Sequence, residues 1–359
     1  MPVRRSAPTS QDVARLAGVS QSTVSYVLTG SRPISAATRR RVEDAIEKLG
    51  YHPNSGARAL RSRRSGVIGL MVPEAYGNDA VLMRFVGAIA REAQRFGYDI
   101  LLVTAQEGAR GIHRVVRTGV CEALILMELG RHDERVAAVI EAGLPFVLIG
   151  KPVGFPNGSV VDLDFERLGR MVVDRAADEG CERLLLFGEP GHRRHRNDVS
   201  RFLLGIEEQA EGTGLEVVLD GGGLPDVPAR ARDLARGGRR TAVFGLSGVT
   251  EVLFATAASG ALADPELLTI ALTDEDLAAI SPLLARIPRI DPRRVEISEL
   301  AVRELVRLLR EDGASPRVTL VEPEWVEQEQ EQRAEHEQRA EQEQPVEQTP
   351  AEHTSTPTS

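Results

Sequence analysis

Residues 12–30 read DVARLAGVSQSTVSYVLTG, two short helical patterns with a glycine between them. Apolar residues recur at helical spacing on both sides of Gly18, and we expect them to face a common core. Thr9 and Asp12 have the spacing of a capping box at the start of the first helix, and Ser20 is placed to cap the second. The residues predicted to face inward are Val13, Leu16, Ala17, Val24, Val27 and Leu28. Two helices joined by such a turn form a helix-turn-helix, whose second helix enters the major groove of DNA.

A third helix is predicted to start at Ser35, after Pro33, and to stop at Gly50. Its inner face would hold Val42, Ala45, Ile46 and Leu49. The exposed side chains of the second helix would be those that read base edges. These are Gln21, Ser22, Ser25 and Tyr26, with Thr23 available for a phosphate. A small three-helix bundle with a solvated polar face gives the same periodicity, so the pattern alone leaves both interpretations open.

The charge is distributed unevenly along the 359 residues, whose formal net charge is −9. Residues 1–66 hold twelve Arg or Lys against four acids, which makes this segment +8. Residues 322–359 hold eleven Glu against two Arg and carry −9, and the middle carries −8. A basic head on an acidic body is typical of a nucleic-acid-binding head.

A short basic segment, PNSGARALRSRR, follows the predicted bundle at residues 53–64. Asn54 can cap one short helix, in which Leu60 is the single large apolar side chain. Such a short helix is marginal in water, so it would form only when paired and held on DNA. Leu60 would then be a wedge in the minor groove. The alternative is a flexible basic linker.

Four motifs follow one another in residues 9–64: DVA-x-x-AGVS-x-x-TVS-x-V-L, S-x-x-TR-x-x-V, LGY-x-PN and A-x-x-L. This segment resembles the DNA-binding head of the LacI/GalR (lactose-repressor) family. The resemblance implies that Gln21, Ser22 and Tyr26 read bases, although Tyr26 stands where many relatives carry Arg. It implies that the residues holding the DNA backbone are Thr9, Ser20, Thr23, Ser25 and Asn54, and that Ala57 and Leu60 are the hinge residues that enter the minor groove. Arg39, a basic residue of the third helix, completes the predicted DNA-binding set.

From Ser65 onward, apolar runs such as GVIGLMV and EALILMEL alternate with amphipathic helical stretches. This alternation predicts an α/β fold of parallel strands with crossover helices, in two doubly wound subdomains. A ligand cleft would lie between them, at the carboxyl ends of the strands. The resemblance implies the same periplasmic-binding-protein-like effector core, which dimerises. The predicted divisions are a helix-turn-helix head at 1–52, a hinge helix at 53–65, the effector-binding and dimerisation core at 66–325, and a Glu/Gln-rich disordered tail at 326–359.

Polar residues in loops after the predicted strands are the candidates for contacting an effector. The predicted effector-binding residues are Asn78, Lys151, Arg201, Ser247 and Asp274, and Glu128, Asp164 and the 188–197 loop are further candidates. Arg201 and Asp274 match the places from which sugar-binding relatives clamp hydroxyl groups, and charge-assisted hydrogen bonds suit such ligands. Surface ion pairing would place the same residues there. Ser247-Gly248 replaces the acidic Asn-Asp pair usual in sugar-responsive relatives, so we expect a ligand other than a plain hexose, or a lost response.

Several other functions lack sequence support. Cys121 and Cys181 provide neither a disulfide framework nor zinc-site spacing. His192 and His195 have no third metal ligand nearby, and no catalytic signature occurs, so we expect neither an enzyme nor a cofactor. No apolar segment is typical of a signal peptide or a membrane span, which predicts a soluble, cytoplasmic protein without membrane contact.

Together these patterns predict a transcriptional regulator, a repressor, that binds a pseudo-palindromic double-stranded operator as a homodimer under allosteric control by a small polar effector. One alternative is an effector-independent architectural or orphan DNA-binding protein. Another is a small-molecule binding protein related to periplasmic receptors, against which the basic head argues. The acidic tail could compete with DNA for the head.

Overall fold

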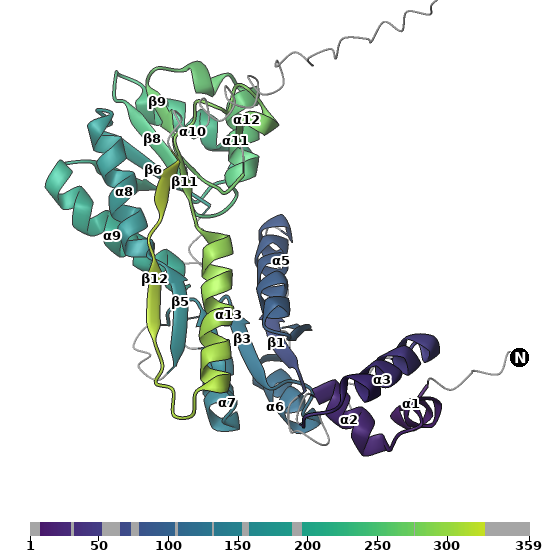
Figure 1. The fold of residues 1–359 in the computed structure, drawn as a ribbon. Coiled ribbons are helices and arrows are strands. Elements are labelled where there is room, and N and C mark those ends of the chain that lie inside the picture. Colours follow the sequence, from purple (N-terminus) through teal and green to yellow (C-terminus); the bar gives the residue numbers. More distant parts are fainter. Residues whose placement is uncertain are drawn as a thin grey trace, which may run out of the picture.

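The computed structural model describes residues 8–29, 32–51, 65–72, 79–104, 107–130, 133–152, 158–188, 196–275 and 277–326 (Figure 1). In these residues, three N-terminal helices precede two α/β lobes. The helices of the head are α1 (Ser10–Ala17), α2 (Gln21–Thr29) and α3 (Ala36–Leu49). No helix in this part of the chain combines the length and apolar character needed to cross a bilayer.

The predicted helix caps of the head are confirmed. The Thr9 hydroxyl accepts a hydrogen bond from the Asp12 N–H at 3.3 Å, and the Asp12 carboxylate accepts one from the Thr9 N–H at 2.9 Å. Gly18 ends α1 in the left-handed conformation at φ 65°, which glycine adopts without steric cost. The Ser20 hydroxyl accepts from the Thr23 N–H at 3.1 Å, and Ser35 caps α3. Local hydrogen bonding therefore sets the boundaries of all three helices at their N-termini.

The head has its own small core, and two of the residues predicted to face inward do not join it. The core comprises Val13, Ala14, Ala17, Val24, Val27, Val42, Ala45 and Tyr51. Leu16 is 52% exposed and Leu28 is 38% exposed, so both predictions were wrong. At 100° per residue, Leu16 lies about 110° from the centre of the face formed by Val13, Ala14 and Ala17. Leu28 lies in the last turn of α2.

The first lobe is built on a six-stranded parallel sheet of order β12-β5-β4-β3-β1-β2. Its strands are β1 (Val67–Val72), β2 (Asp99–Thr104), β3 (Ala123–Met127), β4 (Phe146–Ile149), β5 (Ser159–Leu163) and β12 (Val318–Val321). Helices α5 (Asp79–Arg95) and α13 (Arg294–Arg310) cover one face. Helices α6 (Gly108–Thr118) and α7 (Glu134–Ala142) cover the other. Nearly every central strand position is apolar because both faces are buried.

The second lobe combines a parallel sheet of order β7-β6-β8-β9 with a three-stranded sheet of order β10-β11-β13. Its strands are β6 (Arg183–Phe187), β7 (Glu216–Leu219), β8 (Thr241–Gly245), β9 (Leu267–Thr269), β10 (Ala271–Leu272), β11 (Arg289–Asp291) and β13 (Glu324–Val326). Its helices are α8 (Phe165–Asp178), α9 (Asn197–Thr213), α10 (Val227–Ala235), α11 (Val249–Ala258) and α12 (Leu277–Ile280). Strand β13 runs antiparallel to β11, the one pairing among the described strands that departs from the predicted parallel arrangement.

The chain crosses between the lobes at three places, which makes the two lobes one structural unit. The crossings run from β5 into α8, from β11 into α13, and from β12 into β13 (Figure 1). The predicted α/β class with two doubly wound subdomains is therefore confirmed. The carboxyl ends of strands from both sheets meet between the lobes.

Helices α8 and α9 approach closely through two glycines. A Cβ at Gly205 would overlap the carbonyl oxygen of Glu166, and one at Gly169 would overlap that of Phe202. We expect Gly205→Ala to lower the free energy of unfolding by about 1–3 kcal/mol, because rigid backbone must move apart. Gly212→Ala is the matched control in the same helix, since a Cβ there meets nothing within 4 Å. That variant should gain about 0.5–1 kcal/mol of stability from helix propensity. Urea denaturation of both variants measures the contrast, and equal effects would contradict it.

Candidate DNA-reading helix and interlobe pocket

The outer face of α2 presents the side chains predicted to read bases. Gln21 and Ser22 are exposed, and Ser25 and Tyr26 are half-buried. The Gln21 Nε2 atom donates to the Ser10 hydroxyl at 2.7 Å, so α1 orients the glutamine amide. This orienting contact involves Ser10, which the sequence did not single out.

Hydroxyl groups at the start of α2 form a small network. The Ser20 hydroxyl is 2.8 Å from the hydroxyls of both Ser22 and Thr23. These three residues share the N-terminus of a helix, where backbone N–H groups attract phosphate. Arg39 lies half-buried in the first turn of α3.

Tyr26, on the face of α2 predicted to read bases, is uncharged but contacts a cation. The Arg32 guanidinium lies over the Tyr26 ring, 5.1 Å from its centroid, a cation–π arrangement. Arg32 is one of the basic residues of the head. It lies between α2 and α3, so its contact with Tyr26 follows only from the folded structure. A guanidinium therefore stands beside the position where the resemblance leads one to expect an arginine.

Several predicted residues fall outside the described part of the chain. They are Asn54, Ala57 and Leu60 of the predicted hinge, Asn78 of the predicted effector site, and His192 and His195. Among the described residues, no cluster of three or more His, Cys, Asp or Glu side chains has the arrangement of a metal site.

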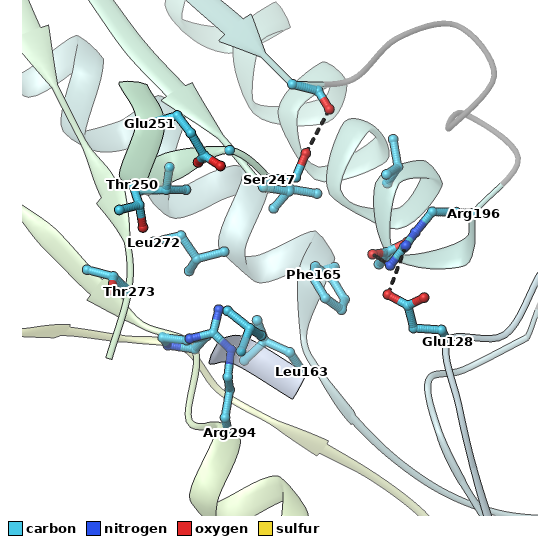
Figure 2. Close-up of a pocket in the computed structure, with 18 of the residues that line it drawn as sticks. Glu128, Leu163, Phe165, Arg196, Ser247, Thr250, Glu251, Leu272, Thr273 and Arg294 are labelled. Atoms are coloured by element: carbon cyan, nitrogen blue, oxygen red, sulfur yellow. Dashed lines mark hydrogen bonds and ion pairs between the residues drawn. The ribbon is translucent and has the colours of Figure 1, made fainter. Parts of the chain in front are cut away.

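A pocket of about 630 Å³ opens between the two lobes (Figure 2). It lies where strands end, since Glu128 follows β3, Gly188 follows β6 and Thr273 follows β10. The predicted position of the cleft therefore agrees with the structure. The pocket combines charged and hydroxyl side chains with the aromatic rings of Phe85 and Phe165.

Of the predicted effector-binding residues, Ser247 and Asp274 line this pocket. The Ser247 hydroxyl donates to the Gly188 carbonyl at 2.8 Å. Asp274 accepts a hydrogen bond from Arg294 at 2.8 Å, and the Arg84 Nε lies 3.7 Å away. Arg294, at the start of α13, was not singled out in the sequence.

Arg201 and Lys151 do not line the pocket, so the prediction that Arg201 and Asp274 hold ligand hydroxyls from opposite walls does not fit this pocket. The Arg201 side chain is 6% exposed, and α9 directs it toward carboxylates that follow or end β5. It donates to Asp162 at 2.8 Å and to Glu166 at 3.2 Å. Lys151 contributes its backbone N–H, which donates to Asp162 at 2.9 Å. Arg201 thus contacts Asp162, which lines the pocket, without lining the pocket itself. The guanidinium beside Asp274 is that of Arg294.

Burial and ion pairing act in opposite directions on the charged groups of the pocket. Burial raises the pKa of Asp162 to about 7, although Arg201 and the Lys151 N–H favour its ionised form. For Arg196, burial opposes the charge, but Asp198 and Glu128 raise its pKa overall. Arg196 lies in the 188–197 loop, which the sequence indicated as a further candidate, and it lines the pocket.

Comparisons with known proteins agree with this arrangement. Residues 9–54 match the family model described as "Bacterial regulatory proteins, lacI family". The chain is 34% identical over 199 residues to the HTH-type transcriptional regulator CelR of Thermobifida fusca, covering 53% of this chain and 55% of that protein. It is 36% identical over 149 residues to the regulator RafR of Escherichia coli, covering 40% and 44%. The chain thus matches about half the length of these curated relatives.

Solved structures extend the likeness to both lobes. A transcriptional regulator CelR–cellobiose complex has a TM-score of 0.59 at 25% identity, covering 89% of this chain and 98% of that one. The lac repressor dimer bound to operator and the anti-inducer ONPF has a TM-score of 0.71 at 20% identity with the same coverage, which shows the shared fold.

The fold and the pocket define a two-lobed α/β protein with an interlobe pocket and a helix-turn-helix head. Residues 9–54 match the lacI family of bacterial regulatory proteins, and most of the chain is similar in fold to solved regulators. The resemblance seen in its N-terminal motifs is therefore confirmed.

Proposed function

We propose that this protein is a sequence-specific DNA-binding transcriptional regulator, a repressor, whose operator affinity is set by a small molecule in the interlobe pocket. The observation that carries the proposal is that one chain contains both an exposed α2, whose Gln21 amide is oriented by a hydrogen bond to Ser10, and a polar pocket between two lobes. It acts in the cytoplasm, without an enzymatic activity or a cofactor. The DNA-binding residues proposed from the sequence are retained, and Arg32 joins them.

The proposed effector is a sugar of more than one ring. Hydroxyl-rich ligands need donors and acceptors in one place, and the carboxylate–guanidinium pairs of Asp274–Arg294 and Glu128–Arg196 offer both. Phe85 and Phe165 offer apolar surface for a sugar ring. A relative of similar fold was solved as a complex with cellobiose, which supports the same ligand class here.

Selection of binding sites from genomic DNA, with and without cellobiose, maltose, raffinose and glucose, tests this proposal. A two-fold symmetric site whose occupancy changes with one sugar is the expected result. Binding that no sugar or cell extract alters would favour the second candidate, an effector-independent architectural DNA-binding protein. Failure to select any sequence would overturn both.

Exposed apolar side chains indicate where two copies meet. Phe254 on α11 is 55% exposed, and Ile280 and Leu283 are also exposed. Their elements pack together through Leu253, Leu277 and Leu284. Contiguous exposed apolar surface marks protein–protein contacts. We place the homodimer contact of the second lobe here, and a dimer presents two heads to a pseudo-palindromic operator.

The orientation of Gln21 gives a first prediction about DNA. We expect Gln21→Ala to weaken operator binding about tenfold, because a bidentate base contact is worth roughly 1–3 kcal/mol. Binding to unrelated DNA should stay unchanged. Fluorescence anisotropy with labelled duplexes measures both affinities. Gln94→Ala, an exposed position on α5 far from the head in sequence, is the matched control. Equal loss on both DNAs would exclude Gln21 as a base-reading residue.

A further inference from the structure

Two loops from different lobes contact each other at one end of the pocket. The loop after β3 supplies Glu128, Leu129 and Gly130, and the start of α9 supplies Arg196 and Asn197. The Arg196 Nη1 atom lies 3.0 Å from the Glu128 carboxylate, and Figure 2 marks this ion pair with a dashed line. The Asn197 Nδ2 atom donates to the carbonyl oxygens of Leu129 and Gly130, each at 2.9 Å. Gly130 and Arg196 also form an isolated antiparallel β-bridge.

Contacts within the second lobe fix the position of the Arg196 side chain. Arg196 donates to Asp198 through Nε at 3.1 Å and through Nη2 at 2.7 Å, a bidentate pair that fixes the guanidinium plane. The remaining Nη1 points to Glu128. Asn197 is only 2% exposed, so its two hydrogen bonds to the other lobe form away from water, where a lost partner is costly.

The first-lobe half is equally constrained. Glu128 has a φ of 49°, in the left-handed region that non-glycine residues adopt only when their surroundings require it. The buried Arg135 guanidinium donates to the carbonyl oxygens of Met127 at 3.2 Å and Glu128 at 2.8 Å. It also pairs with Asp133 at 2.6 Å. The hydrogen bonds of Arg135 therefore fix this loop in the conformation that turns the Glu128 carboxylate toward Arg196.

We propose that Glu128, Arg196 and Asn197 form an interlobe clasp that keeps the cleft closed before any ligand binds. Figure 2 shows the Glu128–Arg196 pair of this clasp on one side of the pocket and Arg294, which pairs with Asp274, on another. Because Arg196 and Glu128 line the pocket and also join the lobes, a ligand that bonds to either one changes the balance between open and closed forms. This last consequence rests on the proposed function, whereas the clasp itself rests on the contacts.

The distance between the lobes in the ligand-free protein tests the clasp. Spin labels on Glu141→Cys in α7 and Glu207→Cys in α9, both exposed positions, report one lobe each. Burial raises the pKa of Cys121 and Cys181 to about 11, so these thiols resist labelling. In the parent protein we expect a narrow distance distribution. Glu128→Gln and Asn197→Ala should each broaden it toward longer distances, and the double variant should do so more.

Glu208→Gln is the control, since it removes an ion pair between Arg170 and Glu208 that lies within the second lobe. This variant should leave the distribution unchanged, and circular dichroism verifies that every variant is folded. A distribution in the double variant that matches the parent would overturn the clasp. Titration of the same proteins with cellobiose separates the two proposals: absence of binding to the parent counts against the effector class, and the distance measurement still decides the clasp.

Discussion

Replacing Arg201 with methionine should lower the free energy of unfolding of the core by about 3–5 kcal/mol at pH 8.5, because it leaves a buried carboxylate without its cation. Methionine keeps much of the apolar stem, so the loss is mainly that of the charge. Three carboxylates surround the guanidinium: Asp162 at 2.8 Å, Glu166 at 3.2 Å and Asp164 at 3.7 Å. Asp162 is nearly inaccessible to water and cannot replace Arg201 with solvent.

The cost should depend on pH with a defined sign. The pKa of Asp162 in the native protein is about 7, above its ordinary value of 3.8, so the native state holds this proton more tightly than the unfolded chain. The stability that this group contributes is fully present below pH 3.8 and is lost as pH rises through about 7. Without Arg201 the carboxylate keeps its proton to still higher pH. The penalty of Arg201→Met should therefore be smaller at pH 6 than at pH 8.5.

The single tryptophan, Trp325 in β13, is a fluorescence reporter in the lobe that contains Arg201. The Arg175 guanidinium lies over its ring, 5.4 Å from the centroid, so unfolding changes its surroundings. A loss of this size should move the urea midpoint down by roughly 1 M or more. Asp162→Asn combined with Arg201→Met should recover much of the loss. An equal penalty at both pH values would contradict the role assigned to Asp162.

Short-range signals allowed the head to be predicted from sequence, because its boundaries depend on contacts three residues apart. Thr9 with Asp12, and Ser20 with Thr23, are such pairs, and each forms the hydrogen bond expected of it. Leu16 was misplaced because an eight-residue helix has too few apolar positions to define its buried face. The burial of that face depends on α3, which lies farther along the chain.

The location of the pocket could be predicted from the rule that parallel strands present their carboxyl ends to a ligand. The rule selects loops and says nothing of side-chain direction. Lys151 and Ser247 both follow predicted strands, yet only Ser247 reaches the pocket. Arg201 pairs with Asp162, 39 positions earlier, and Arg196 pairs with Glu128, 68 positions earlier. Such pairings depend on where the folded chain places the start of α9 relative to β5 and the loop after β3, which the spacing of residues in sequence does not encode.

Phe254→Asp should convert the proposed dimer to a monomer and lower the affinity for the full operator by about 10²–10⁴-fold, since each head would then bind without the avidity of its partner. A carboxylate at the centre of an apolar contact loses its water on association without gaining a cation, a cost that the remaining contacts of Ile280 and Leu283 cannot offset. Analytical ultracentrifugation measures the oligomeric state, and anisotropy measures the affinity for a full operator and for a half-site.

Affinity for the half-site should be the same in the parent and in the Phe254→Asp variant, because the head is untouched. Leu204→Asp is the matched control: Leu204 on α9 is 50% exposed and lies away from the cluster of Leu253, Leu277 and Leu284. This variant should remain a dimer with full operator affinity. A Phe254→Asp protein that stays dimeric would move the contact elsewhere, with the exposed Met83 of α5 and Leu102 of the sheet-edge strand β2 as the next positions to replace. A monomer that retained full operator affinity would instead show that one head carries the specificity alone, and the operator would then need no two-fold symmetry.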